Sequence, residues 1–380
     1  TRIGNMALHR QLPIQNRMKG CLLDNNGKVV EYLPPTSWLG ATRDGSRGQV
    51  MVKVPYHYRK FETDGNIRRA KISEYPLPGY HYVPETYISA YEATVQRSTN
   101  MLCSVVNSDP DYRGGYGRAD WDGTYRSLLG RPVSSESGAT LQSWARSRNA
   151  SATSEWNILD YTCWKAVQWL YLIEFANRNS QLPFSAERDA NGYKQGGLGM
   201  GATTAPSTIN DWNSQYAFIP CGYTDSLGNG SGEMSYTALN EDGSVFTEVM
   251  VNRYRGIENP FGHLGKICCG CLSLIGANGA DIYTANDPEL YNFDTVDGYY
   301  KQTSLPTSGG YFKDITFGEH GDIIPAGGGG GSTTFWCDTL WVTLRDPEVI
   351  RPLAISGASK ATSSGGMFAF DAAWGSSNAN

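Results

Sequence analysis

One long segment of the chain repeats its hydrophobic residues with the period of an α-helix. Between residues 161 and 178 large apolar side chains recur at three- and four-residue steps, which predicts a single helix that buries them. They are Trp164, Val167, Leu170 and Tyr171. A shorter helix is expected over residues 139–148, because the serines within residues 134–137 offer capping hydroxyls in front of it.

Strand-like alternation dominates the beginning of the chain. Residues 49–55 alternate in the manner of a half-buried strand, and residues 24–27 and 64–66 carry the turn residues of hairpins. Two prolines and a glycine near residue 78 interrupt this pattern. We therefore expect a small β-rich module over residues 1–84, followed by one larger domain over residues 85–380.

Beyond residue 185 the helical period is absent and glycines interrupt short strands, including one expected over residues 335–344. The chain holds 44 glycines in 380 residues, well above the average of about 7%. The predicted fold class is α+β, with an early pair of helices and a long, loop-rich β region.

Charge and hydropathy exclude several classes of partner. The formal net charge is -5, which provides no general attraction to phosphate backbones, so we expect no nucleic-acid partner. No run reaches the roughly 18 apolar residues that span a bilayer, so no membrane insertion is expected either.

The residues that enzymes and metal sites need are scattered. None of the five histidines has the spacing of a metal site, and Cys268 and Cys271 form one CxxC pair without a second. Residues 228–232 are glycine-rich but lack the strand and helix of a nucleophile elbow. No cofactor is expected, although an acidic, loop-rich domain is compatible with a structural calcium ion.

Three strings resemble segments of the formylglycine-generating-enzyme superfamily, in matching order and spacing. Residues 83–94 (VPETYISAYEAT) resemble the strand that opens its C-type-lectin-like domain, and residues 255–262 (RGIENPFG) resemble its mid-domain segment. Residues 351–368 resemble its glycine-rich closing part. The resemblance covers about residues 84–380 and implies a C-type-lectin-like fold with long glycine-rich loops.

Within that superfamily the chain is most similar to variable proteins of diversity-generating retroelements, which include phage tropism determinants. The resemblance implies that residues 354–380 form a variable stretch. The positions it assigns to the variable, ligand-binding surface are Ala358, Lys360, Ala361, Ser364, Ala369, Asp371, Ala373 and Trp374. Phe368 and Phe370 are expected to be buried between them as scaffold.

The resemblance implies a non-enzymatic protein that binds a host-cell surface receptor, either protein or glycan. Its expected setting is a virion, at a phage tail fibre or tip, as a homo-oligomer that could be a trimer. Two alternatives stay open: a bacterial surface adhesin with the same variable domain, and an enzyme of the superfamily. Against the enzyme, Cys337 stands alone where the oxidase has a cysteine pair. Against calcium-dependent sugar binding, residues 258–260 have the lectin motif's residue types in the wrong order.

Overall fold

The computed structural model describes residues 11–151, 155–214 and 217–374. Of these residues, 35% lie in strands and 13% in helices of any kind. The α-helices are α2 (Gly138–Arg146), α3 (Tyr161–Phe175) and the single-turn α4 (Ile209–Asn213). Short 3-10 helices are η1 (Gln15–Arg17), η2 (Ala119–Trp121), η3 (Gly201–Thr204), η4 (Asp225–Leu227), η5 (Pro288–Leu290) and η6 (Thr362–Ser364).

The first part of the chain forms two small sheets. A four-stranded sheet has the order β2-β1-β3-β7 and a three-stranded sheet the order β5-β4-β6. Their strands are β1 (Lys19–Leu23), β2 (Val29–Tyr32), β3 (Gln49–Val54), β4 (His57–Asp64), β5 (Ile67–Ser73), β6 (His81–Val83) and β7 (Thr86–Ser89). The predicted strand and both hairpin turns are confirmed, since β3 covers residues 49–54 and the turns join β1 to β2 and β4 to β5.

The middle of the chain adds two hairpins and a three-stranded sheet of order β12-β13-β14. These strands are β8 (Thr94–Gln96), β9 (Met101–Cys103), β10 (Phe184–Arg188), β11 (Lys194–Gly196), β12 (Gly232–Leu239), β13 (Val245–Tyr254) and β14 (Ile257–Glu258).

The last third forms an eight-stranded sheet of order β17-β16-β15-β21-β22-β20-β18-β19. Its strands are β15 (Lys266–Ile275), β16 (Ala280–Thr284), β17 (Tyr300–Ser304), β18 (Gly310–Phe317), β19 (Asp322–Gly328), β20 (Thr339–Trp341), β21 (Val349–Ile355) and β22 (Phe370–Asp371). The edge strands β17 and β19 approach each other, so the sheet is nearly closed like a barrel. Of the strand expected over residues 335–344, only residues 339–341 are in β20.

The predicted α+β, C-type-lectin-like fold is wrong. Strands outweigh helices almost three to one, and the glycine-rich region builds long strands and a barrel-like sheet. Hydrophobic periodicity does not reveal these strands, because glycines lie where the strands are irregular. Gly270 has φ of +72° inside β15, where the pairing of β15 with β21 shifts register, so the alternation of side chains breaks although the strand continues.

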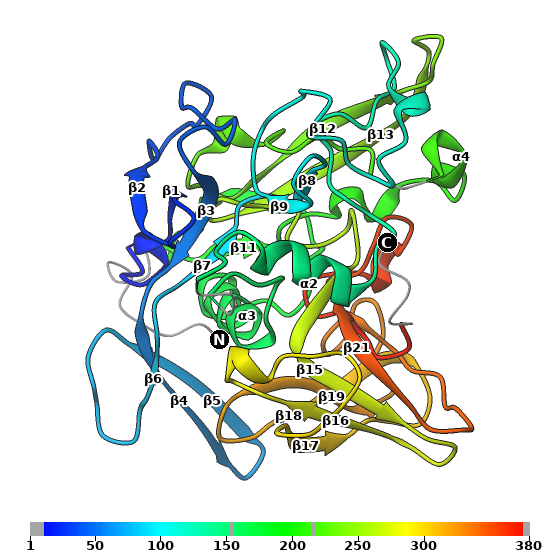
Figure 1. The fold of residues 1–380 in the computed structure, drawn as a ribbon. Helices are drawn as coiled ribbons and strands as arrows, with labels where there is room; N and C mark the ends of the chain where they lie inside the picture. Colours follow the sequence, from blue (N-terminus) through cyan, green and yellow to red (C-terminus); the bar gives the residue numbers. More distant parts are fainter. Residues whose placement is uncertain (1–10, 152–154, 215–216, 375–380) are drawn as a thin grey trace.

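Helix α3 is confirmed, and it lies in the middle of the molecule between the four-stranded and the eight-stranded sheets (Figure 1). Its first turn is capped by Asp160, whose carboxylate accepts from the Cys163 N–H at 2.8 Å. It ends at Phe175, three residues before the expected end, and the residue that follows, Ala176, has left-handed backbone. The shorter helix is confirmed as α2, with Ser137 as its N-cap.

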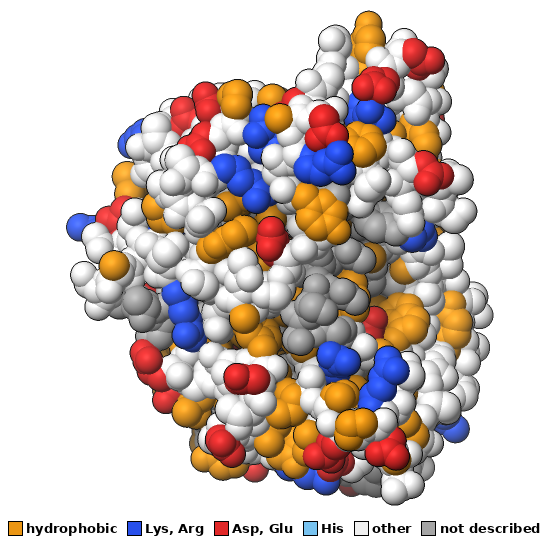
Figure 2. All heavy atoms as spheres, turned by 45° about the vertical axis from the view of Figure 1, so that its right-hand side comes forward, with side chains coloured by type: hydrophobic (Ala, Val, Ile, Leu, Met, Phe, Trp, Pro, Cys, Tyr) orange, Lys and Arg blue, Asp and Glu red, His pale blue; other side chains and the backbone are white. Residues whose placement is uncertain are grey.

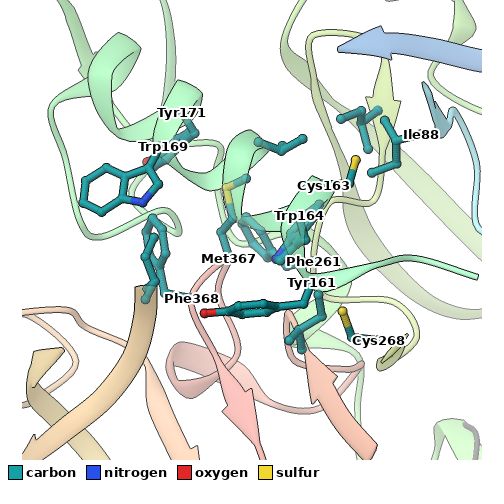
Figure 3. Packing of buried hydrophobic residues seen from close by; sticks show 14 of the residues in the cluster. Ile88, Tyr161, Cys163, Trp164, Trp169, Tyr171, Phe261, Cys268, Met367 and Phe368 are labelled. Carbon is teal, nitrogen blue, oxygen red and sulfur yellow. The ribbon is translucent and has the colours of Figure 1, made fainter. Parts of the chain in front are cut away.

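The four core positions predicted in α3 are all buried, with exposures between 0% and 1%. Twelve of its fifteen residues are buried, because sheets cover it on opposite sides. Figure 3 shows Trp164 beside Phe261 within this core. A buried ion pair, Lys165 Nζ to Asp322 Oδ1 at 2.7 Å, joins α3 to β19.

One hydrophobic cluster extends from Ile14 to Ala372 and includes α3 and strands of both large sheets. Strand β7 follows residue 84 and pairs with β3, which precedes it. The four-stranded sheet therefore crosses the expected boundary at residue 84, and the N-terminal module shares its core with the rest of the chain.

Candidate functional site

The C-terminal stretch folds into a strand, a loop and a short second strand. The loop, residues 356–369, leaves β21 and returns to β22, which pairs with both β21 and β20. Three of its non-glycine residues have left-handed backbone: Ser356, Lys360 and Thr362, with φ of 69°, 71° and 52°. Each such conformation costs about 1–3 kcal/mol and is typical of binding loops. Residues 375–380 of the expected variable stretch lie outside the described residues.

A pocket of about 280 Å³ opens against this loop, and five of the eight expected ligand-binding residues line it. They are Ala358, Lys360, Ala361, Asp371 and Trp374. The other wall residues are Gly265, Trp341, Ala354, Ile355, Gly357 and Ser359. We call this the C-terminal pocket.

The other three expected residues lie outside this pocket. Ser364 is half-buried at the end of η6, where its hydroxyl donates to the Ala361 carbonyl at 2.5 Å. Ala373 is half-buried, and its N–H donates to Asp371 at 2.8 Å. Ala369 is only 2% exposed, so the expectation that it faces solvent is wrong. It is buried because it follows Phe368 and precedes Phe370 where the chain passes under the loop into β22.

The two expected scaffold residues are buried, as predicted. Phe368 is 1% exposed and Phe370 2%. The Phe368 ring packs edge-on against Trp336 with ring centres 5.4 Å apart, and it also contacts Tyr171 of α3. The loop is thus attached to the central core by its aromatic residues.

A buried carboxyl group holds the end of the loop through its backbone. Asp338 accepts from the Gly366 N–H at 2.7 Å and from the Phe368 N–H at 2.8 Å. Burial raises the pKa of Asp338 to about 7. A side chain at residue 366 would collide with this anchor, because an added Cβ would lie 2.6 Å from the Asp338 carboxylate and 2.5 Å from the Ser180 hydroxyl.

Further anchors come from α3 and the segment after it. The Ser180 hydroxyl accepts from the Met367 N–H at 2.9 Å, and Gln168 donates to the Met367 carbonyl at 2.9 Å. Gln181 donates to the Thr362 carbonyl at 2.6 Å. All of these bonds end on backbone atoms of the loop, so they do not require particular side chains at the positions that line the pocket.

The pocket combines flat apolar surfaces with two charged groups. Trp341 and Trp374 provide indoles, and the Trp374 ring lies so close to Gly265 that a Cβ there would be 2.2 Å from it. Burial raises the pKa of Asp371 to about 6. Lys360 donates to Asn210 of α4 at 3.0 Å. This set can stack against a ligand, accept hydrogen bonds and donate them.

The face of the molecule shown in Figure 2 does not favour one charge. Figure 2 shows one face of the molecule with Lys and Arg side chains mixed among Asp and Glu side chains, and with hydrophobic side chains between them. Selectivity on such a surface has to come from shaped sites more than from a long-range field.

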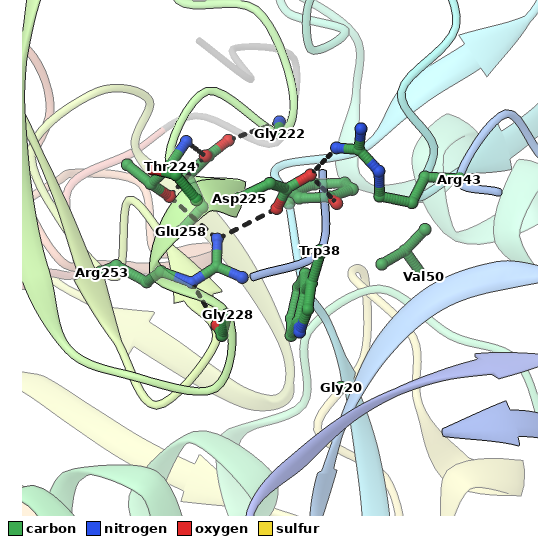
Figure 4. A network of polar contacts seen from close by, with 12 residues as sticks. Gly20, Trp38, Arg43, Val50, Gly222, Thr224, Asp225, Gly228, Arg253 and Glu258 are labelled. Atoms are coloured by element: carbon green, nitrogen blue, oxygen red, sulfur yellow. Dashed lines mark hydrogen bonds and ion pairs between the residues drawn. The ribbon is translucent and has the colours of Figure 1, made fainter. Parts of the chain in front are cut away.

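A buried polar network includes Glu258 of the segment 255–262, together with Asp225 and Arg253 (Figure 4). Asp225 accepts from Arg253 at 3.2 Å and from the Tyr91 hydroxyl at 2.7 Å. Glu258 accepts from the N–H and the hydroxyl of Thr224 at 2.7 and 2.6 Å, and burial raises its pKa to about 7. These carboxyl groups are at most 3% exposed and accept hydrogen bonds from within the protein, so the network holds the loop before β12.

Within the described ranges, no group of three or more His, Cys, Asp or Glu side chains is placed to hold a metal ion. Cys268 and Cys271 are completely buried free thiols, and burial raises the pKa of both. No helix in the part of the chain that the structure describes is long and apolar enough to cross a membrane.

Sequence reasoning missed six of the eleven wall residues of the C-terminal pocket, two of which lie outside the expected variable stretch, and all of the hydrogen-bonding anchors of the loop. Gly265 and Trp341 come from β-strand ends far from the loop, and no local pattern marks them as neighbours of Trp374. The sequence gives only a weak indication that Asp338 is an anchor. It lies between Cys337 and the strand Thr339–Trp341, and an aspartate is rarely buried unless it accepts hydrogen bonds. No family model and no curated protein is similar enough to this chain to count as a match.

Proposed function

We propose that this protein is a non-enzymatic attachment protein that binds a receptor on a host-cell surface through the C-terminal pocket. The proposal rests on one observation: in the C-terminal stretch, some residues line the pocket while others are buried in the core. Five of the assigned ligand-binding residues line one pocket, while Phe368 and Phe370 between them are buried. Residues that alternate in this way allow the surface to change while the fold is kept.

The backbone anchors support a diversified surface. Asp338, Ser180 and Gln168 hold the loop by its N–H and C=O groups, and none of them is among the assigned variable residues. In this sequence the residues at positions 358 and 361 are both alanine, and their small side chains leave the pocket open. Larger residues at these two positions would fill the pocket and present a different surface, as a retroelement-diversified protein requires.

A pocket of about 280 Å³ is close to the lower limit of about 300 Å³ for small-molecule sites, so a single copy would contact only a small part of a receptor. Several copies in a homo-oligomer, such as a trimer at a phage tail tip, would raise avidity by about 10²- to 10⁴-fold. The same surface would serve a bacterial adhesin, and detection of the protein on virions or on cells separates the two settings.

The test is adsorption of labelled protein to a panel of bacterial strains. A triple variant, Lys360→Ala, Asp371→Ala and Trp374→Ala, should lose adsorption to strains that the parent binds, because hot spots concentrate on such residues. The matched control carries Lys28→Ala, Asp297→Ala and Tyr300→Ala, which lie outside the pocket. If the triple variant adsorbs like the control while both remain folded, the C-terminal pocket is not the attachment site.

Diversification has its own test at the level of the gene. A reverse-transcriptase gene should lie near the coding sequence, together with a near-copy of the codons for residues 354–380 that is rich in asparagine codons. A genome without either would refute the diversification but not the attachment function.

A further inference from the structure

A second pocket, of about 290 Å³, lies between the four-stranded sheet, α2 and the start of α3. We call it the interlayer pocket. Its body is apolar and is formed by Met51, Ile88, Leu141, Ala145, Ile158, Leu159, Cys163 and Ile267, among others. Figure 3 shows two of these, Ile88 of β7 and Cys163 of α3, next to each other. It shares Gly265 with the C-terminal pocket, but none of the eight assigned variable residues lines it.

Two N–H donors on its wall lack an acceptor. The Asn157 amide nitrogen and the Trp164 indole nitrogen are both buried without a hydrogen-bond partner among the described residues. The orientation of the Asn157 amide is fixed, because its oxygen accepts from Gln142 at 3.1 Å. A buried donor without a partner costs about 1–3 kcal/mol, so both groups favour a ligand that brings an acceptor.

The wall also contains a buried cation whose partners are all neutral. Arg148 is 8% exposed; it donates to the Asn25 side chain at 3.1 Å and contacts the Leu102 carbonyl and the Cys103 sulfur. Its guanidinium lies 5.5 Å from the centre of the Trp156 ring. Among the described residues its hydrogen-bond partners are thus an amide, a carbonyl and a thiol, and none is a carboxylate. Buried arginines are usually paired with an anion, so this one favours an anionic ligand.

The acidic residues of the wall are already engaged elsewhere. Glu92 accepts from Lys266 at 2.8 Å and from His263 at 2.5 Å. Glu258 accepts from Thr224, and Asp160 caps α3. Glu155, the remaining acidic residue of the wall, is exposed and accepts from Asn149 at 3.4 Å. The groups of the wall that lack a matching partner are therefore two neutral donors and one cation.

We infer that the interlayer pocket binds a small amphipathic carboxylate, with its apolar body among the aliphatic side chains and its carboxylate at Arg148 and the free N–H groups. The site is independent of the attachment surface, so either proposal can fail without the other. A pocket of this volume suits a molecule of about ten non-hydrogen atoms.

Isothermal titration calorimetry at pH 7 with octanoate, octan-1-ol and octylammonium tests this inference on the full chain. The three probes share one apolar body and differ in the charge of the head group. Octanoate should bind with a stoichiometry of one and at least about tenfold more tightly than octan-1-ol, because a hydrogen bond to a charged group is worth about 1.5–3 kcal/mol. Octylammonium should bind more weakly than the alcohol.

Variants test where the probes bind and which residue makes the pocket prefer a negatively charged probe. Arg148→Gln should weaken octanoate at least about tenfold and leave octan-1-ol unchanged, whereas Arg146→Gln, two residues earlier at the end of α2 and outside the pocket, should change neither. Ala145→Phe should weaken every probe by filling the pocket. Circular dichroism checks that it folds, and Ala93→Leu, at another wall position, replaces it if it does not.

Three results would overturn the inference. The first is equal affinity of the parent for octanoate and octan-1-ol, and the second is absence of octanoate binding up to millimolar concentration. The third is octanoate binding that survives the pocket-filling change, which would place the bound molecule elsewhere.

Discussion

Removal of the Asp338 carboxylate should release the C-terminal loop from the core. Asp338→Ala leaves the buried N–H groups of Gly366 and Phe368 without their acceptor. Each orphaned donor costs about 1–3 kcal/mol, so the free energy of unfolding should fall by about 2–6 kcal/mol. For a chain of 380 residues, whose entropy of unfolding scales with length, this lowers Tm by about 3–8 °C.

The size of this effect should depend on pH, and the sign follows from the pKa of Asp338. Burial raises that pKa to about 7, so between about pH 4 and pH 7 the folded chain keeps a proton that the unfolded chain has released. The contribution of Asp338 to stability is therefore full below about pH 4 and is lost as pH rises through 7. At about 1.4 kcal/mol per pH unit, the difference between parent and variant should shrink by about 3 kcal/mol between pH 5 and pH 8.

Urea denaturation at pH 5 and pH 8 measures both quantities, and hydrogen exchange reports whether the amides of Gly366 and Phe368 open first. Asp297→Ala is the matched control, because Asp297 is exposed and its loss should change stability by no more than about 0.5 kcal/mol. If Asp338→Ala unfolds at the same urea concentration as this control at both pH values, the carboxylate is not the anchor that its geometry indicates.

Three further changes probe the core and the division between scaffold and surface. Trp164→Ala should cost about 3–5 kcal/mol in urea denaturation, because the indole is 1% exposed and leaves a cavity; a loss below 1 kcal/mol would contradict its place in the core. Gly265→Ala should displace the Trp374 indole and abolish adsorption to cells with little loss of stability, since the new methyl group would lie 2.2 Å from the ring; unchanged adsorption would show that Trp374 is dispensable. Ala369→Leu should cost about 1–3 kcal/mol by overpacking, whereas Ala358→Leu should leave the melting temperature nearly unchanged and alter what is bound; equal melting temperatures would refute the separation of roles.

Local patterns were enough to predict the elements whose causes are local. The helix at Tyr161–Phe175 follows from the spacing of its apolar residues, and the helix at Gly138–Arg146 from its capping serine. The burial of Phe368 and Phe370 was expected from the resemblance, which implies a scaffold role for them between the variable positions. Five of the residues assigned to the variable surface by resemblance line one pocket.

Tertiary structure alone decided the fold class, and it alone brought together the pocket residues that lie far apart in the chain. Strand β15 contains a glycine with left-handed backbone at a register shift, so it has no regular alternation, and the barrel-like sheet depends on pairings between strands far apart in the chain. Ala369 is buried because its neighbours turn inward, although alanine itself is equally suited to a surface. Gly265 and Trp374 meet across more than one hundred residues, and Arg148 lacks a carboxylate only because of what packs around it. Such contacts depend on long-range packing, which periodicity over a few residues does not contain.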